Sequence, residues 1–159
     1  MPPFKAKRVT HSYIQKNLAP PDRVFTLLCP VREKEWLDGW DYEMIYSESG
    51  LAEEGCIFRT INPGESESTW VVTRHDKENY RVEFVRITPG SRVVQIHISL
   101  KEDRDGATRA HIRYTYTGIT EEGNSFVDNY TKEQFHNMMT WWEKSINHFL
   151  TSGQKLTQS

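Results

Sequence analysis

Hydrophobic and polar residues alternate along most of the middle of the chain. A first, looser alternation runs from Phe4 to Gln15, and clearer ones follow as far as Gly118. A period of two residues is typical of strands that bury one face. The pattern predicts six strands after the first, over Trp40–Ser47, Gly55–Asn62, Ser68–His75, Tyr80–Thr88, Arg92–Glu102 and Ala107–Gly118.

The turns between these strands are short, and they include Ser-Gly, Asn-Pro-Gly, Lys-Glu-Asn, Pro-Gly and Arg-Asp-Gly. Such turns join neighbouring strands as antiparallel hairpins. Side chains alternate between the two faces of a strand, so the pairing of two strands determines which of their side chains share a face. We predict that the loop Arg104–Gly106 sets Ile98 opposite Ile112 and Ile96 opposite Tyr114. A loop at Lys77–Asn79, with the asparagine in the left-handed conformation, sets Val72 opposite Phe84 and Trp70 opposite Arg86.

Helices are expected at both ends of this strand region. Prolines and an early acid predict a helix over Pro21–Cys29, and a second follows over Arg32–Leu37. Thr131 and Gln134 form a capping box that starts a long helix at Lys132. Its apolar residues recur at helical spacing until Gly153, and they are Phe135, Met138, Met139, Trp142, Ile146, Phe149 and Leu150.

This order of elements resembles the START and pollen-allergen helix-grip superfamily, also called SRPBCC, with its polyketide cyclase/dehydrase-like branch. Local similarities lie at Ala19–Phe25, at Trp36 with Trp40, at Gly55–Phe58 and at Trp70–Thr73. The resemblance implies an α+β fold in which a curved seven-stranded antiparallel sheet (β-α-α-β6-α) wraps a long C-terminal helix and encloses a cavity. Members include carriers of hydrophobic ligands, polyketide cyclases and chaperone activators, so the fold leaves the function open.

Length and charge narrow the class of protein. The 159 residues fit one domain, residues 1–159, and 20 basic against 22 acidic side chains leave a net charge of -2. This balance disfavours nucleic acid as a partner. No apolar stretch approaches the roughly 18 residues of a membrane span, and no basic-then-apolar leader is evident, so we expect a cytoplasmic protein without membrane insertion. Cys29 and Cys56 are interpreted as small buried hydrophobes.

The predicted faces give a candidate ligand-binding surface that is apolar with a few hydroxyl groups. Cys56 and Val72 lie on the same face. The candidate ligand-binding residues are Tyr42, Met44, Tyr46, Phe58, Trp70, Phe84, Arg86, Ile96, Ile98, Ile112, Tyr114, Tyr116, Met138, Met139 and Trp142. Small-molecule sites are usually lined in this way. The alternative is that the same side chains simply fill the core.

Two of these residues could anchor a ligand. Tyr114 shares a strand face with Tyr116, so both hydroxyls could meet one ligand carbonyl or phenol. Tyr114 could then orient the ligand, unless it is a core tyrosine bonded to a backbone carbonyl. Arg86 could bind a carboxylate or stack on an indole, unless its long stem carries the charge to water.

The remaining polar residues are weaker candidates for a functional site. His97 and His111 are expected on the outer face, diagonal to each other and solvated. Asp128 and Asn129 could stand at the cavity mouth, although residues before a helix more often cap it, and Glu121 with Glu122 indicates a solvated turn. Asp41 and Glu43 face outward. No metal-binding spacing, nucleophile motif or phosphate-binding loop is present, so no metal or cofactor is expected.

Three functions remain. The first is the binding of a hydrophobic small molecule, such as a lipid, polyketide or aromatic compound. The second is a cyclase, aromatase or dehydratase that uses tyrosine or carboxylate acid-base chemistry, ranked lower because no inward base is evident. The third is a protein-interaction module or homodimer, which an exposed outer face at Val71, Val85 and Ile87 would favour.

Overall fold

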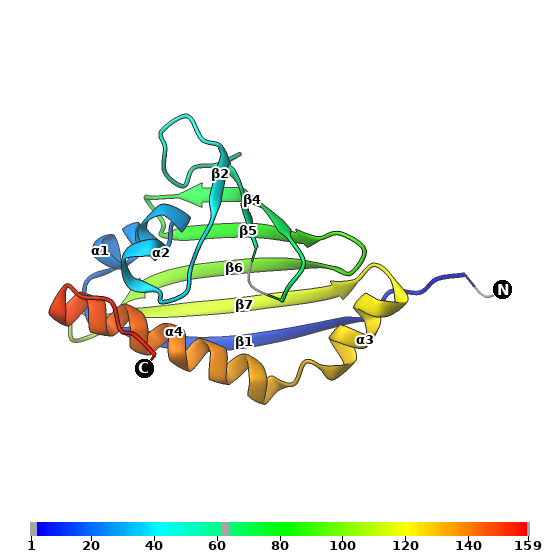
Figure 1. Cartoon of the computed structure of the whole chain (residues 1–159). Coiled ribbons are helices and arrows are strands. Elements are labelled where there is room, and N and C mark those ends of the chain that lie inside the picture. Colours follow the sequence, from blue (N-terminus) through cyan, green and yellow to red (C-terminus); the bar gives the residue numbers. More distant parts are fainter. Residues whose placement is uncertain (1–2, 62–63, 159) are drawn as a thin grey trace.

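The computed structural model describes residues 3–61 and 64–158. It shows one curved sheet with helices packed along one edge and at both ends (Figure 1). The strands are β1 (Arg8–Asn17), β2 (Glu43–Tyr46), β3 (Ile57–Thr60), β4 (Ser68–Asp76), β5 (Arg81–Thr88), β6 (Arg92–Glu102) and β7 (Thr108–Gly118). The helices are α1 (Pro21–Thr26), α2 (Pro30–Trp36), α3 (Glu121–Asn129) and α4 (Lys132–Ser152).

The seven-stranded sheet has the order β1-β7-β6-β5-β4-β3-β2, with antiparallel neighbours throughout. The first strand of the chain therefore lies beside the last strand, β7. The sheet is open, and β1 and β2 are its edge strands. Helix α4 runs along β1, whereas α1 and α2 lie at one end of the sheet and α3 at the other (Figure 1). This is the helix-grip architecture expected from the sequence.

The predicted cross-strand pairs are confirmed. Ile98 lies opposite Ile112, and Ile96 lies opposite Tyr114, across a turn in which Gly106 takes a φ of 82°. Trp70 also faces Arg86, and Val72 faces Phe84. The alternation of hydrophobic residues therefore placed these faces correctly, and the turn at Gly106 set the register between β6 and β7.

The hairpin between β4 and β5 differs from the prediction in its turn. Tyr80, and not Asn79, takes the positive φ of 54°, and a register shift between Val72 and Arg74 absorbs the extra residue. Because a bulge reverses the alternation that follows it, Arg74 faces outward although Val72 faces inward.

Several predicted boundaries were too wide. Helix α1 ends at Thr26 rather than Cys29, and β2 covers only Glu43–Tyr46 of the predicted Trp40–Ser47. Strand β3 begins at Ile57, two residues after the predicted Gly55, and its predicted end at Asn62 lies outside the described residues.

Helix α3 was not predicted. The Thr120 hydroxyl accepts a hydrogen bond from the Gly123 amide at 3.0 Å, so Glu121 and Glu122 begin a capped helix instead of a turn. Asn124 then bonds the N-terminal segment, since it accepts from the Lys7 amide at 2.9 Å and donates to the Lys5 carbonyl at 3.0 Å. The local residue pattern did not predict this helix, because the contacts that hold it are made with residues distant in the sequence.

Helix α4 begins and ends as predicted. Thr131 and Gln134 form the reciprocal capping box, and Gly153 ends the helix with a φ of 73°. Phe135, Met139, Ile146 and Leu150 are buried against the sheet. Among the described helices, none combines the length and the apolar character needed to cross a membrane.

Candidate functional site: a cavity between the sheet, α2 and α4

A cavity of about 190 Å³ lies between the inner face of the sheet and helices α2 and α4. Strands β3 to β7 supply one wall, and the two helices with the segment that follows α2 supply the other. The lining residues are Pro30, Glu33, Leu37, Trp40, Phe58, Trp70, Phe84, Arg86, Ile96, Ile98, Tyr114, Met138, Met139, Trp141 and Trp142.

Most of the candidate residues from the sequence meet at this cavity. They are Phe58, Trp70, Phe84, Arg86, Ile96, Ile98, Tyr114, Met138, Met139 and Trp142. Ile112 and Tyr116 are buried on the same face of the sheet but do not line the cavity. Met138 is 38% exposed, which places it at the rim.

Three further candidates lie outside the cavity: Tyr42, just before β2, and Met44 and Tyr46 on β2. Tyr42 and Met44 are half-buried against the core, whereas Tyr46 is 54% exposed and donates a hydrogen bond to Glu48 at 3.2 Å. A register shift between Met44 and Tyr46 interrupts the alternation on which their placement depended. The prediction that Tyr46 lies on the inner face of the sheet is therefore wrong.

Aromatic rings form one side of the cavity. Phe58 and Trp70 stack with centroids 5.3 Å apart, and Trp40 meets Trp70 edge to face at 6.0 Å. The indole N–H of Trp70 donates to the Thr60 hydroxyl at 3.0 Å, and that of Trp40 donates to the Pro30 carbonyl at 2.9 Å. Because their polar atoms are already bonded, these indoles present only ring surface to the cavity.

Three polar side chains enter this aromatic space. Glu33 comes from α2, Arg86 from β5 and Tyr114 from β7. Within residues 3–61 and 64–158, the Glu33 carboxyl and the Tyr114 hydroxyl make no hydrogen bond, and the buried Nε of Arg86 has no hydrogen-bond partner. Arg86 instead lies over the Trp70 ring, with Cζ 4.9 Å from the centroid. The site thus combines an acid, a cation and a phenol that form no hydrogen bonds with one another.

Burial changes the acidity of all three groups. It raises the pKa of the Glu33 carboxyl to about 8 and lowers the pKa of Arg86. It also raises the pKa of Tyr114, and the nearby Glu33 carboxyl adds to that increase. Tyr114 is therefore a neutral donor near pH 7, and Glu33 exchanges its proton close to that pH.

Glu33 was missed from the sequence, which indicated no inward acid. A signal was nevertheless present. Glu33 precedes Trp36 by three residues and Leu37 by four, so helical spacing places it on the face of α2 that carries these apolar side chains. Trp36 is fully buried, and its indole N–H donates to the Leu27 carbonyl at 3.1 Å, which fixes that face toward the interior.

His11 was also overlooked. It lies opposite Tyr114 on the inner face of β1, only 8% exposed, and its ring stacks on Phe135 with centroids 5.3 Å apart. Tyr116 and Tyr130 approach the ring edge to face. The Nε2 atom of His11 is buried and has no hydrogen-bond partner among the described residues. His11 therefore borders the cavity wall behind Tyr114.

Other polar candidates lie elsewhere. Asp128 forms a surface ion pair with Lys7 at 2.6 Å, and Asn129 ends α3, so neither stands at the cavity. His97 and His111 lie outside and diagonal to each other, as predicted, but His97 is not merely solvated because its Nδ1 lies 2.6 Å from Glu83. The part of the chain that the structure describes holds no group of three potential metal ligands.

No model of a known protein family matches the sequence, and a search of curated proteins found no match. Solved structures do match over nearly the whole chain. Norcoclaurine synthase from Thalictrum flavum, in a truncated form, is 14% identical with a TM-score of 0.69, over 96% of this chain and 99% of the other. Ara h 8.0201 is 12% identical with a TM-score of 0.64, over 92% and 99%.

DynU16, from the dynemicin biosynthetic locus, is 16% identical with a TM-score of 0.62, over 91% of this chain and 48% of the other. These neighbours share the helix-grip fold, and the chain has that fold. The identities are low, so the likeness is one of architecture.

Proposed function

We propose that the protein binds a small aromatic compound carrying a polar group in the cavity between the sheet, α2 and α4. One observation carries the proposal. Three polar groups, on Glu33, Arg86 and Tyr114, enter an aromatic cavity without hydrogen-bonding one another. The Nε of Arg86 is buried without a hydrogen-bond partner among the described residues, which is costly, and a ligand that bonds it recovers that cost. The Glu33 carboxyl and the Tyr114 hydroxyl offer further hydrogen bonds to the same ligand.

The size of the cavity favours a single ring. An apolar cavity of about 150 Å³ holds benzene, and drug-sized ligands usually occupy 300 Å³ or more. The volume of about 190 Å³ therefore suits one substituted ring better than a lipid or a fused polyketide. In support, one structure of norcoclaurine synthase contains dopamine and hydroxybenzaldehyde, both single-ring compounds.

The polar groups indicate which substituents fit. The Arg86 guanidinium offers donors and a positive charge to a carboxylate or phenolate. Glu33, protonated below about pH 8, can donate to a carbonyl or hydroxyl, and Tyr114 can do the same. A ring with an acidic group toward Arg86 would form an ion pair with the guanidinium group.

Tryptophan fluorescence tests this proposal, since Trp40, Trp70 and Trp142 all line the cavity. The probes are phenylacetate and its neutral match, phenylacetamide. We expect saturable binding of both, with the carboxylate preferred about tenfold, and loss of that preference in Arg86→Gln. The control Arg92→Gln removes another half-buried arginine, one that packs over Phe126 outside the cavity, and should keep the preference. Absence of saturable binding by either probe would contradict the proposal.

Glu33 supports a second candidate, an acid-base enzyme acting on such a compound. A carboxyl group with a pKa of about 8 can take and return a proton near neutral pH. As a minimal reaction, the Glu33 carboxylate removes a proton from the carbon beside a ketone, and the electron pair moves to the carbonyl oxygen. Tyr114 or Arg86 would stabilise the enolate oxygen formed in that step.

Deuterium exchange of phenylacetone in heavy water measures this step without knowledge of the natural substrate. We expect exchange that rises with pH through about 8 and is abolished in Glu33→Gln, while phenylacetate binding persists. Equal exchange by the wild type and Glu33→Gln would remove the enzyme and leave the binding function.

A further inference from the structure

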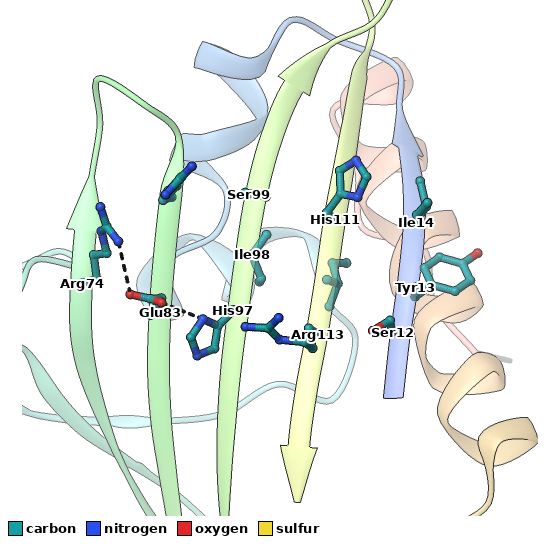
Figure 2. A pocket seen from close by; sticks show the side chains of 12 residues that line it. Ser12, Tyr13, Ile14, Arg74, Glu83, His97, Ile98, Ser99, His111 and Arg113 are labelled. Carbon is teal, nitrogen blue, oxygen red and sulfur yellow. Dashed lines mark ion pairs between the residues drawn. The ribbon is translucent and has the colours of Figure 1, made fainter. Parts of the chain in front are cut away.

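A second hollow of about 400 Å³ lies on the opposite, outer face of the sheet, over strands β4 to β7 and β1 (Figure 2). Two cross-strand rows form it. In one row, Arg113 lies between Ser12 and His97, and Glu83 lies between His97 and Arg74. The neighbouring row places Ser99 between Arg81 and His111, and Ile14 follows His111 at the sheet edge.

The hollow exists because its central side chain is small. Ser99 has Arg81 and His111 directly opposite on the two neighbouring strands, and Arg113 on the diagonal. Directly opposed side chains lie about 5 Å apart, and diagonal ones about 7 to 8 Å. Long side chains on three sides of a serine therefore leave a depression with the hydroxyl group at its floor.

The charges around this depression are unbalanced. Of the described residues, Glu83 is the only acid that lines it. Its carboxylate lies 2.6 Å from His97 Nδ1 and 4.0 Å from the Arg74 guanidinium group. Across residues 3–61 and 64–158, Arg81 and Arg113 form no ion pair. In Figure 2, Arg113 extends from β7 toward His97 on β6. Two exposed arginines without an ion pair among the described residues therefore line the hollow, Arg81 directly opposite Ser99 and Arg113 on its diagonal.

We propose that this hollow, centred on Ser99, binds an oxyanion of the phosphate or sulfate type. Arg81 and Arg113 supply charge-assisted donors from two sides, and the Ser99 hydroxyl and the His111 ring supply further donors. Ile14, which is 60% exposed at the edge, offers apolar contact to the group that carries the anion. The site is separate from the inner cavity and does not depend on the function proposed for it.

Proton NMR of the His97 and His111 rings tests this site, because both rings line the hollow. The probes are inorganic phosphate and phenyl phosphate, added at constant ionic strength against chloride. We expect saturable shifts of these ring signals, with tighter binding of phenyl phosphate. Arg81→Gln and Arg113→Gln should each weaken binding at least fivefold.

Arg8→Gln provides the matched control. Arg8 lies on the same outer face of β1, four residues from Ser12 and so about 13 Å away, beyond the roughly 8 Å screening length of physiological salt. It should keep the affinity within twofold. Shifts that do not saturate, or that respond equally to Arg8→Gln and Arg113→Gln, would overturn the proposal.

A phosphate group can also belong to a lipid, and vesicles distinguish that source. Sedimentation with phosphatidic acid vesicles should leave the protein in solution if the site takes a small molecule. Binding to these vesicles, together with no saturable binding of phosphate or phenyl phosphate, would overturn the small-molecule site and identify the face as a membrane-binding surface.

Discussion

Arg86 and Trp70 lie directly opposite each other on β5 and β4, and the guanidinium carbon is 4.9 Å from the centroid of the indole ring. The contact keeps a cation on the inner face of the sheet, where burial lowers the pKa of Arg86. A lowered pKa means that folding disfavours the charged form at every pH below that value. The arginine is thus retained at some cost to stability.

Replacement of Arg86 should therefore separate stability from binding. In Arg86→Met the charge is removed while the stem is roughly preserved, and we expect the free energy of unfolding to rise by about 1 kcal/mol, or the melting temperature by about 2 to 4 °C. Phenylacetate binding should fall at the same time. Arg113→Met on the outer surface should change stability by no more than about 0.5 kcal/mol. A marked loss of stability in Arg86→Met would show that the ring contact outweighs the desolvation.

Glu33 should make stability depend on pH. Its pKa rises from 4.5 in the unfolded chain to about 8 in the folded protein, so between these values the folded state holds a proton that the unfolded state has lost. The contribution of protonated Glu33 to the free energy of unfolding is therefore fully present below about pH 4.5, and it is lost as the pH rises toward about 8. The slope attributable to this group is at most about 1.4 kcal/mol per pH unit.

Urea unfolding at pH 5, 6, 7 and 8 measures this effect when wild type and Glu33→Gln are compared. We expect Glu33→Gln to gain stability relative to wild type as the pH rises, because the amide cannot ionise. Glu35→Gln on the exposed face of α2 is the matched control and should follow wild type. If the difference in the free energy of unfolding between wild type and Glu33→Gln is the same at all four pH values, the Glu33 carboxyl is exposed to water in the folded protein and ionises as it does in the unfolded chain.

Much of the inner wall was predictable because period-two patterns and short turns leave little freedom. Ile96, Ile98 and Tyr114 had to share a face once Gly106 fixed the turn. Predictions failed where one residue broke the alternation, as at the irregularities after Val72 and Met44. A single extra residue reverses every later side chain, and no local pattern marks where it is inserted.

The helical wall was less predictable for a different reason. Glu33 and Trp40 lie on or after a short helix whose position against the sheet is set by packing from distant segments. A sequence pattern identifies the apolar face of such a helix, but not what that face meets. The same holds for α3, whose Asn124 bonds the segment before β1.

Helix α3 provides a sharp test of close packing. A Cβ added to Gly123 would lie 1.7 Å from the Ser91 carbonyl oxygen, which is a backbone atom and cannot rotate away. We expect Gly123→Ala to lower the free energy of unfolding by at least about 2 kcal/mol, through displacement of α3 from the start of β6. Ser125→Ala, on the exposed side of the same helix, should cost no more than about 0.5 kcal/mol. Similar stabilities in chemical denaturation would contradict this contact.

Met138 allows occupancy of the cavity to be measured directly. It lines the cavity and yet is 38% exposed, so a thiol placed there should react with a water-soluble reagent unless a ligand covers it. The natural thiols, Cys29 and Cys56, are buried, and burial raises the pKa of Cys56, which further suppresses its reaction. Labelling of Met138→Cys should therefore exceed the wild-type background by at least tenfold, and saturating phenylacetate should slow it at least fivefold.

Lys132→Cys is the matched control, because position 132 begins the same helix, is exposed and does not line the cavity. Its labelling should be unchanged by phenylacetate. Equal protection of both thiols would indicate a general effect of the ligand on the protein or the reagent. Protection of position 138 alone requires that the ligand occupy the space beside α4, since the two thiols share a helix and differ in whether they face the cavity.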